Sequence, residues 1–158
     1  MMANYNTTNQ LGGTPQAMTT TYKTVLSVYS SSGTAVRRGK VYDVLVGVDG
    51  TPADNAMVWD ISRQTAAGTA TSVTPLPLDP ADAAALSVST ANSTVEPTIT
   101  ANSSVFNVAV NQRASFRWVA APGSELVYPA TNLAGFALRC KSPAYTSTVT
   151  GDMYFQEQ

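Results

Sequence analysis

Short segments of alternating polar and apolar residues, separated by turn residues, recur through most of this 158-residue chain. This period of two is typical of a half-buried β-strand, in which successive side chains point to opposite faces. The segments that we predict as strands are 22–29, 40–48, 55–63, 69–74, 94–100, 105–111, 114–120, 125–128, 134–141 and 146–155. Because no long helical pattern interrupts them, the sequence predicts an all-β protein.

The strongest of these segments each carry one apolar face. The shared faces are Tyr42, Val44, Val46 and Val48 in the second segment, Met57, Trp59 and Ile61 in the third, and Phe136, Leu138 and Cys140 in the ninth. Two packed antiparallel sheets bury such one-sided strands. We therefore predict an antiparallel two-sheet sandwich, a jelly-roll or a related Greek-key arrangement, with an immunoglobulin-like sandwich as the alternative.

A helical pattern occurs at one place, Leu78–Leu86. Asp79 is a good N-cap residue, Pro80 fits the first helical position, and the alanines that follow favour propagation. The sequence therefore predicts one short helix of at most two turns, connecting strands.

The first 21 residues have no periodicity and contain Gly12, Gly13 and Pro15, which break regular structure. Tyr5, Leu11 and Met18 are the only sizeable apolar side chains that could anchor this segment. We therefore divide the chain into an extended N-terminal arm, 1–21, and a β-sandwich domain, 22–158. Contact with another chain is expected to order the arm; the alternative is an edge strand along its own domain.

Charged residues make up only 12% of the chain, against about 25% in a typical soluble domain. With so few charges, electrostatic repulsion between copies is weak, which suits a protein that packs against neighbours. Ser- and Thr-rich surfaces are also ordinary in β-proteins.

The net charge of −1 leaves no basic excess to neutralise a phosphate backbone, so nucleic acid is not expected as a partner. The sequence shows no signal peptide and no run of about 20 apolar residues, so neither export nor a membrane is expected. We expect synthesis in a host cytoplasm.

The chain contains no histidine and a single cysteine, Cys140. Catalytic Ser-His-Asp and Cys-His systems and histidine-based metal sites are therefore excluded. A carboxylate pair, Glu96 and Glu125, is the remaining enzymatic alternative. Our prediction is a protein that is not an enzyme, with no catalytic residues, no cofactor and no metal.

Arg37, Arg38 and Lys40 form the only dense basic cluster. A solvated turn is one interpretation, and a contact for an acidic patch on a partner is the other. Together with Tyr5, Leu11 and Met18, these residues form our predicted partner-binding set. Four aromatic residues offer a further alternative, a sugar-stacking platform, although their strand periodicity favours the core: Trp59, Phe116, Trp118 and Tyr128.

The stretch Asn111–Thr131, NQRASFRWVAAPGSELVYPAT, resembles segments of small β-rich virion proteins of tailed bacteriophages, as does Pro75–Thr98 with PLPLDPADAAAL and VEPT. These motifs are structural and cover about a third of the chain. The resemblance implies a capsid decoration or cement protein on the virion head, often trimeric, with the major capsid protein as its partner.

We therefore expect a non-enzymatic structural protein that binds the outside of the capsid shell and stabilises it. The alternatives are another virion component (tail, neck or fibre-associated) or a carbohydrate-binding module for host attachment.

Overall fold

A computed structural model describes residues 2–142 and 148–158. The elements in chain order are β1 (Asn4–Thr8), the 3₁₀ turn η1 (Asn9–Leu11), β2 (Lys23–Tyr29), β3 (Gly39–Val48), β4 (Ala56–Ala66), β5 (Thr69–Val73), β6 (Leu76–Pro77), β7 (Val88–Val95), β8 (Thr98–Asn111), β9 (Phe116–Val119), β10 (Leu126–Tyr128), β11 (Gly135–Lys141) and β12 (Val149–Glu157). The all-β prediction is confirmed. The predicted strand start at 146–147 lies outside the described residues.

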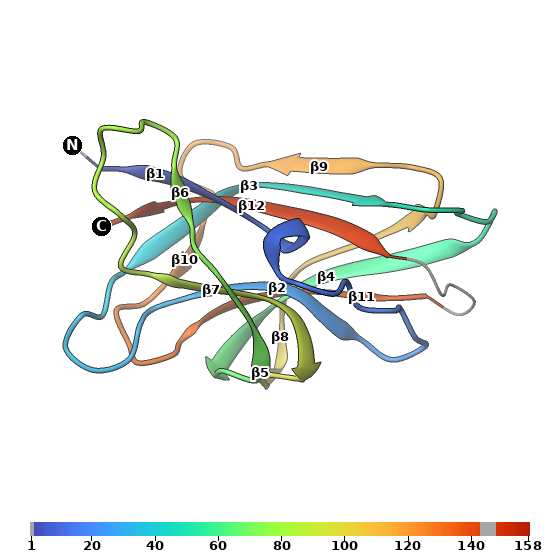
Figure 1. The fold of residues 1–158 in the computed structure, drawn as a ribbon, viewed down its shortest axis with the longest axis horizontal. Helices are drawn as coiled ribbons and strands as arrows, with labels where there is room; N and C mark the ends of the chain where they lie inside the picture. The colour runs from blue at the N-terminus through green and yellow to red at the C-terminus, as the bar shows by residue number, and fades with distance from the viewer. Residues whose placement is uncertain (1, 143–147) are drawn as a thin grey trace.

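In the described part of the chain the strands form two antiparallel sheets of six strands each. Sheet A has the order β6-β1-β12-β3, and both β9 and β10 pair with the far side of β3. Sheet B has the order β5-β7-β2-β11-β4-β8. The two sheets stack face to face, with β3 and β12 over β2 and β11 (Figure 1). The predicted two-sheet sandwich is confirmed.

The predicted apolar faces of β4 and β11 form the centre of the core. Trp59, Ile61 and Leu138 are fully buried, and they belong to one hydrophobic cluster with Met153 and Phe155 of β12. The alternation in the sequence therefore places these side chains between the sheets, as expected for strands with a single apolar face.

The prediction that Tyr42 shares the inward face of β3 is wrong. In the pairing of β3 with β12, Tyr154 lies opposite Asp43, but the next residue, Phe155, lies opposite Val41. Tyr42 is therefore the extra residue of a β-bulge. Val41 and Val44 are consequently both buried. Tyr42 is only half-buried and lies near the ring of Tyr154, with centroids 6.5 Å apart.

The outward face of sheet B is also covered, which the sequence did not predict. Ser27, Ala137 and Gln64 are buried on this face. Strand β4 pairs with β8, and β5, which follows β4 after a bend at Gly68, pairs with β7. These four strands form a bent two-stranded ribbon. One part of the ribbon is joined to β2 through β7 and the other to β11 through β4, so the bend crosses the outward face of β2 and β11. Figure 1 shows β5 and the start of β8 on that side.

The N-terminal segment is part of the sandwich. Strand β1 lies inside sheet A, between β12 and β6, with Tyr5 opposite Phe155 on one side and Pro77 on the other. The expectation of an arm that cannot order itself is corrected. The alternative of a strand along its own domain describes the structure, although β1 is flanked on both sides.

Buried asparagines, not apolar periodicity, hold this segment in place. Asn9 donates through Nδ2 to Val149 O at 2.8 Å, and its Oδ1 accepts from Gly151 N at 2.8 Å. Asn92 of β7 donates through Nδ2 to Asn9 O and Gly12 O at 3.0 and 3.1 Å. These bonds join the turn after β1 to both sheets.

The predicted helix at Leu78–Leu86 is wrong, because these residues form turns and bends. Asp79 does cap a single turn: its Oδ1 accepts from Ala81 N, and its carbonyl accepts from Asp82 N. The chain then follows the outside of β1 instead of continuing as a helix. Leu78 N donates to Asn4 O, and Tyr5 Oη donates to Ala83 O.

We predict that Asn9→Ala lowers the free energy of unfolding by about 3 kcal/mol, because it leaves the Gly151 N–H and Val149 carbonyl buried without that partner. Urea denaturation monitored by tryptophan fluorescence measures this loss. The exposed neighbour provides the control: Gln10→Ala should cost no more than about 0.5 kcal/mol. Equal losses for the two variants would contradict the role of Asn9.

Candidate binding surfaces

The three N-terminal residues predicted to contact a partner do not lie together. Tyr5 and Met18 are buried in the core, and the Tyr5 ring stacks on Phe155 with centroids 5.4 Å apart. Only Leu11 is exposed, with 63% of its surface accessible. In the folded chain Tyr5 and Met18 are therefore unavailable to a partner, because the domain's own core covers them.

The basic cluster is divided among different contacts. Lys40 Nζ lies 3.8 Å from Glu125 Oε1. Arg37 donates from its backbone N to Ser30 Oγ and from Nη1 to its neighbour's carbonyl. Arg38 is exposed and lines a separate cavity. The structure therefore does not present the three residues as one basic patch.

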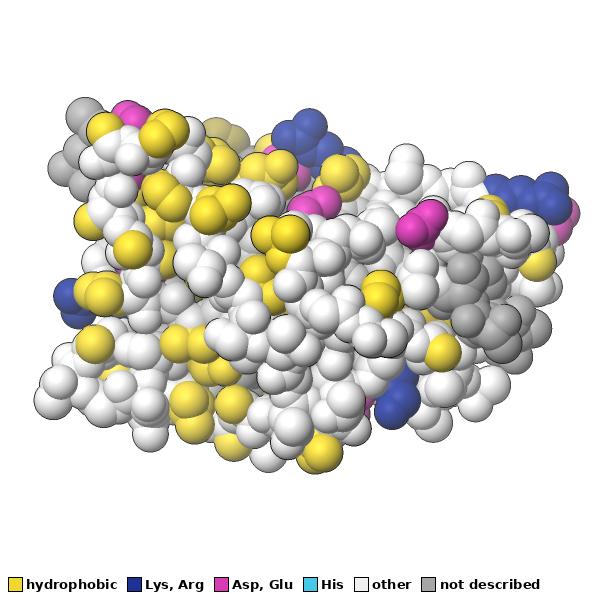
Figure 2. All heavy atoms as spheres, viewed as in Figure 1, with side chains coloured by type: hydrophobic (Ala, Val, Ile, Leu, Met, Phe, Trp, Pro, Cys, Tyr) yellow, Lys and Arg dark blue, Asp and Glu magenta, His cyan; other side chains and the backbone are white. Residues whose placement is uncertain are grey.

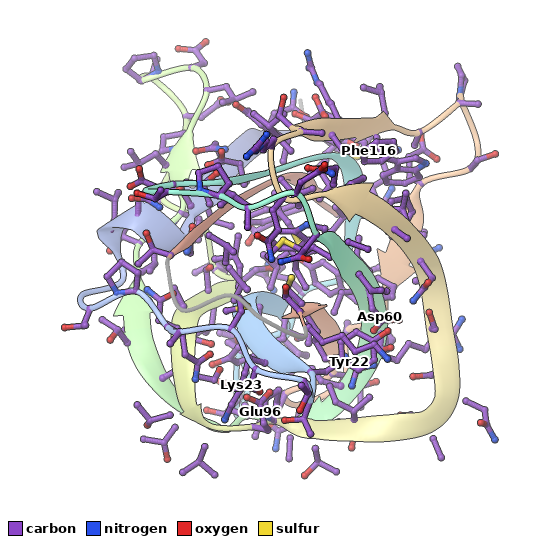
Figure 3. The ribbon with its side chains drawn as sticks, turned by 90° about the vertical axis from the view of Figure 1, so that its right-hand side faces the viewer. Tyr22, Lys23, Asp60, Glu96 and Phe116 are labelled. Carbon is purple, nitrogen blue, oxygen red and sulfur yellow. The ribbon has the colours of Figure 1, made fainter. Side chains whose placement is uncertain are left out.

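The two glutamates considered as an acid–base pair lie beside strands of different sheets, Glu96 in the turn between β7 and β8 and Glu125 just before β10. Glu96 accepts from the backbone N and the hydroxyl of Thr24 in β2, and it lies 4.0 Å from Lys23 Nζ. Glu125 pairs with Lys40 of β3. Figure 3 shows Lys23 and Glu96 together. Each carboxylate thus has its own structural partners.

A buried ion pair lies on the outward face of sheet B. Arg139 of β11 donates to Asp60 Oδ2 of β4 from Nε at 2.9 Å and from Nη2 at 2.6 Å. The guanidinium carbon also lies 4.6 Å from the centre of the Tyr22 ring, and Figure 3 shows Tyr22 beside Asp60. The side chains are only 17% and 2% exposed, so solvent screens this pair little.

Burial alone would raise the pKa of Asp60, but hydrogen bonds from Ser104, Ser62 and Arg139 outweigh it and lower the pKa below 3.8. A carboxyl group with a lowered pKa in the folded state contributes stability that is complete above its unfolded pKa. This contribution is therefore present at neutral pH and is lost as the pH falls below about 4.

A second arginine–aspartate pair lies on sheet A in a more open position. Arg117 of β9 donates to both carboxylate oxygens of Asp43 in β3. Its side chain is 61% exposed, while that of Asp43 is 7% exposed. Because Arg117 lies on the solvent side of this pair, its removal would let water reach the Asp43 carboxylate.

The aromatic residues considered as a sugar platform divide into two groups. Trp59 and Tyr128 are buried in the core. Phe116 and Trp118 of β9 are half-buried, and the centroid of each ring lies 5.9 Å from the ring centroid of Phe106 in β8. These three rings fill the opening between the two sheets and do not form a flat exposed platform.

An exposed apolar surface lies on the segment that the sequence predicted as a helix. Leu76, Leu78 and Leu86 are 54%, 52% and 44% exposed. Met2 is also half exposed and lies two residues from Asn4, which pairs with this segment. Figure 2 shows hydrophobic side chains gathered over the region of β6 and the loop that follows it. We call Leu76, Leu78 and Leu86 the leucine surface.

Sequence reasoning missed the leucine surface because the alanines favoured a helix that would have buried one side. The sequence Leu76-Pro77-Leu78 could have indicated it, because a strand that contains proline is found at the edge of a sheet. Large apolar side chains gathered on a surface of this kind mark interaction sites more often than isolated ones do.

Strand β8 offers a second uncharged surface, at the edge of sheet B. Its 14 residues, TITANSSVFNVAVN, contain neither a charge nor a proline. Natural edge strands commonly carry lysine or proline to prevent pairing with another chain. The regular half from Phe106 to Asn111 pairs with β4 on one side and with no other strand among the described residues.

Residues 2–142 and 148–158 give no support to a metal site, a reactive thiol or a membrane-spanning helix. No group of three or more His, Cys, Asp or Glu side chains there is placed to hold a metal ion. The predicted burial of Cys140 is confirmed, and this burial raises the pKa of its thiol. None of the helical turns in this part of the chain has the length and apolarity to cross a membrane.

Comparison with known proteins finds no match to a family model, to a curated protein or to a solved structure.

We predict that Arg139→Met lowers the free energy of unfolding by about 3 kcal/mol, because Asp60 remains buried without its cation. Thermal or urea unfolding at pH 7 measures the loss. The matched control is Arg117→Met, which should cost less than about 1 kcal/mol, since water solvates the open side of that pair. A larger loss for Arg117→Met would contradict this ranking.

Proposed function

We propose that this chain is a non-enzymatic structural protein of a bacteriophage virion, a decoration protein that binds the outer face of the capsid shell. The resemblance of Asn111–Thr131 and Pro75–Thr98 to small virion proteins supports the assignment of the assembly. The leucine surface is the observation that carries the docking role, because it presents three large apolar side chains to solvent on one segment.

The domain anchors the leucine surface instead of leaving it on a free loop. Tyr5, Asn4 and Glu157 bond to its backbone through the contacts Tyr5 Oη–Ala83 O, Leu78 N–Asn4 O and Ser87 N–Glu157 Oε1. An anchored surface loses little conformational entropy on binding. Its leucines would fill an apolar depression on the major capsid protein.

The energy available from one copy is small. Covering the exposed half of a leucine side chain contributes about 1 kcal/mol, so the leucine surface supplies on the order of 3 kcal/mol. Copies that also contact one another bind a repeating shell with much greater avidity than one copy alone. We assign this contact between copies to the β8 edge, which lacks the charges that would oppose pairing with a second strand.

We predict that the triple variant Leu76→Ser, Leu78→Ser, Leu86→Ser binds shells of the major capsid protein at least about tenfold more weakly than the unmodified chain. Co-sedimentation of the purified protein with undecorated shells measures the affinity. The exposed position of the three leucines should leave the far-UV circular dichroism and the folded state intact.

The matched control replaces three exposed apolar residues elsewhere, Leu45, Val95 and Val119, with serine. Shell binding should be unchanged in this variant. Equal weakening in both triple variants would refute the leucine surface as the docking site. Failure of the unmodified protein to bind shells, with its location on the tail or fibres in labelled virions, would refute the decoration role itself.

Self-association gives a separate test. We predict that Val105→Lys with Ala109→Lys, which places two charges on the β8 edge, shifts the protein toward monomer in sedimentation velocity experiments. The control is Thr69→Lys with Thr71→Lys on β5, the opposite edge of sheet B, which should leave the association unchanged. A purely monomeric unmodified protein, or equal effects of the two pairs, would contradict the role of β8.

A further inference from the structure

A cavity of about 550 Å³ opens at the end of the sandwich where β3 and β11 begin and β4 and β10 end. It is distant in sequence from the leucine surface and shares no residue with it or with the regular half of β8. Its volume is within the range of about 300–1,000 Å³ that is common for small-molecule sites.

Most of the cavity wall is apolar. Val127, Pro129 and Ala134 contribute aliphatic surface, and the nearly buried rings of Phe136 and Tyr128 lie behind them. The Tyr128 hydroxyl bonds to Ser87 Oγ at 2.7 Å. Such a wall accommodates a flat or branched apolar body and excludes a fully hydrated ion.

Two arginines line the same cavity, and its wall includes no acidic residue. Arg38 lies immediately before β3, and Arg63 lies near the end of β4. Among the described residues neither guanidinium has an acidic side chain within 4.0 Å, whereas Lys23, Lys40, Arg117 and Arg139 each have one. The cavity therefore presents two guanidinium groups without a direct ion pair among the described residues.

We propose that this cavity binds a small organic acid, in which one carboxylate is attached to an apolar body. Arg38 and Arg63 bind the carboxylate at the mouth through charge-assisted hydrogen bonds. Val127, Pro129 and Ala134 contact the apolar body. The proposal is independent of the capsid role, because it depends only on the geometry and charge of this cavity.

The first experiment titrates the full-length protein with 4-phenylbutyrate, up to about 10 mM, by isothermal titration calorimetry. We expect saturable binding of one molecule per chain. The uncharged isostere 4-phenylbutyramide should bind about tenfold more weakly, because it lacks the charge that the arginines recognise. Absence of saturable phenylbutyrate binding, or equal affinity for the amide, would overturn the proposal.

Variants then locate the site. Arg63→Gln and Arg38→Gln should each weaken phenylbutyrate binding about tenfold, and Ala130→Trp should block it by filling the exposed side of the cavity. The matched control is Arg113→Gln, which removes another exposed arginine from a different cavity and should leave the affinity unchanged. Equal weakening by Arg113→Gln would refute the site.

Inorganic phosphate separates this proposal from a simple anion site. Phosphate at about 10 mM should not displace phenylbutyrate, because it cannot use the apolar wall. Competition by phosphate at the same concentration as phenylbutyrate would show that charge alone directs binding, and it would overturn the assignment of an apolar acid.

Discussion

The pairing of β1 with β12 is the interaction on which the rest of this structure depends. Strand β1 fills the place between β12 and β6, and Asn9 and Asn92 bond the turn after it to both sheets. Strand β6 pairs in sheet A with β1 alone, and the segment after it is bonded to β1 and, at Ser87, to Glu157 of β12. The leucine surface therefore depends on β1 and β12 for its position, and fold and docking surface are thermodynamically linked.

The placement of charge divides the molecule into surfaces of different kinds. Among the ion pairs of the described residues are four of the nine basic side chains, two of them paired with aspartates that are nearly buried. With so few charges left over, the β8 strand carries none, while Arg38 and Arg63 line their cavity without an ion pair among the described residues. A sparse charge set thus gives a neutral sheet edge and one basic cavity on a single domain.

Sequence reasoning predicted β2, β3, β4 and β11 closely, because their apolar residues recur at the strand period and face a single core. It missed β1, whose NYNTT sequence lacks hydrophobic alternation and whose following turn is held by Asn9 and by the distant Asn92. Local propensity also favoured a helix at Leu78–Leu86, where pairing with β1 prevailed. The basic cavity was invisible because Arg38 and Arg63 are 25 positions apart, and only the sandwich brings them to one wall.

The position of β12 has a consequence for synthesis of the protein on the ribosome. This strand lies between β1 and β3, so sheet A cannot close until the strand that is translated last among the described elements has emerged. Until then β1 has only the two residues of β6 as a partner, and the apolar inner face of β3 lacks its main neighbour. Contacts between such distant positions form slowly. The nascent chain therefore exposes unpaired strand edges until β12 has emerged, and over that interval its folding competes with aggregation.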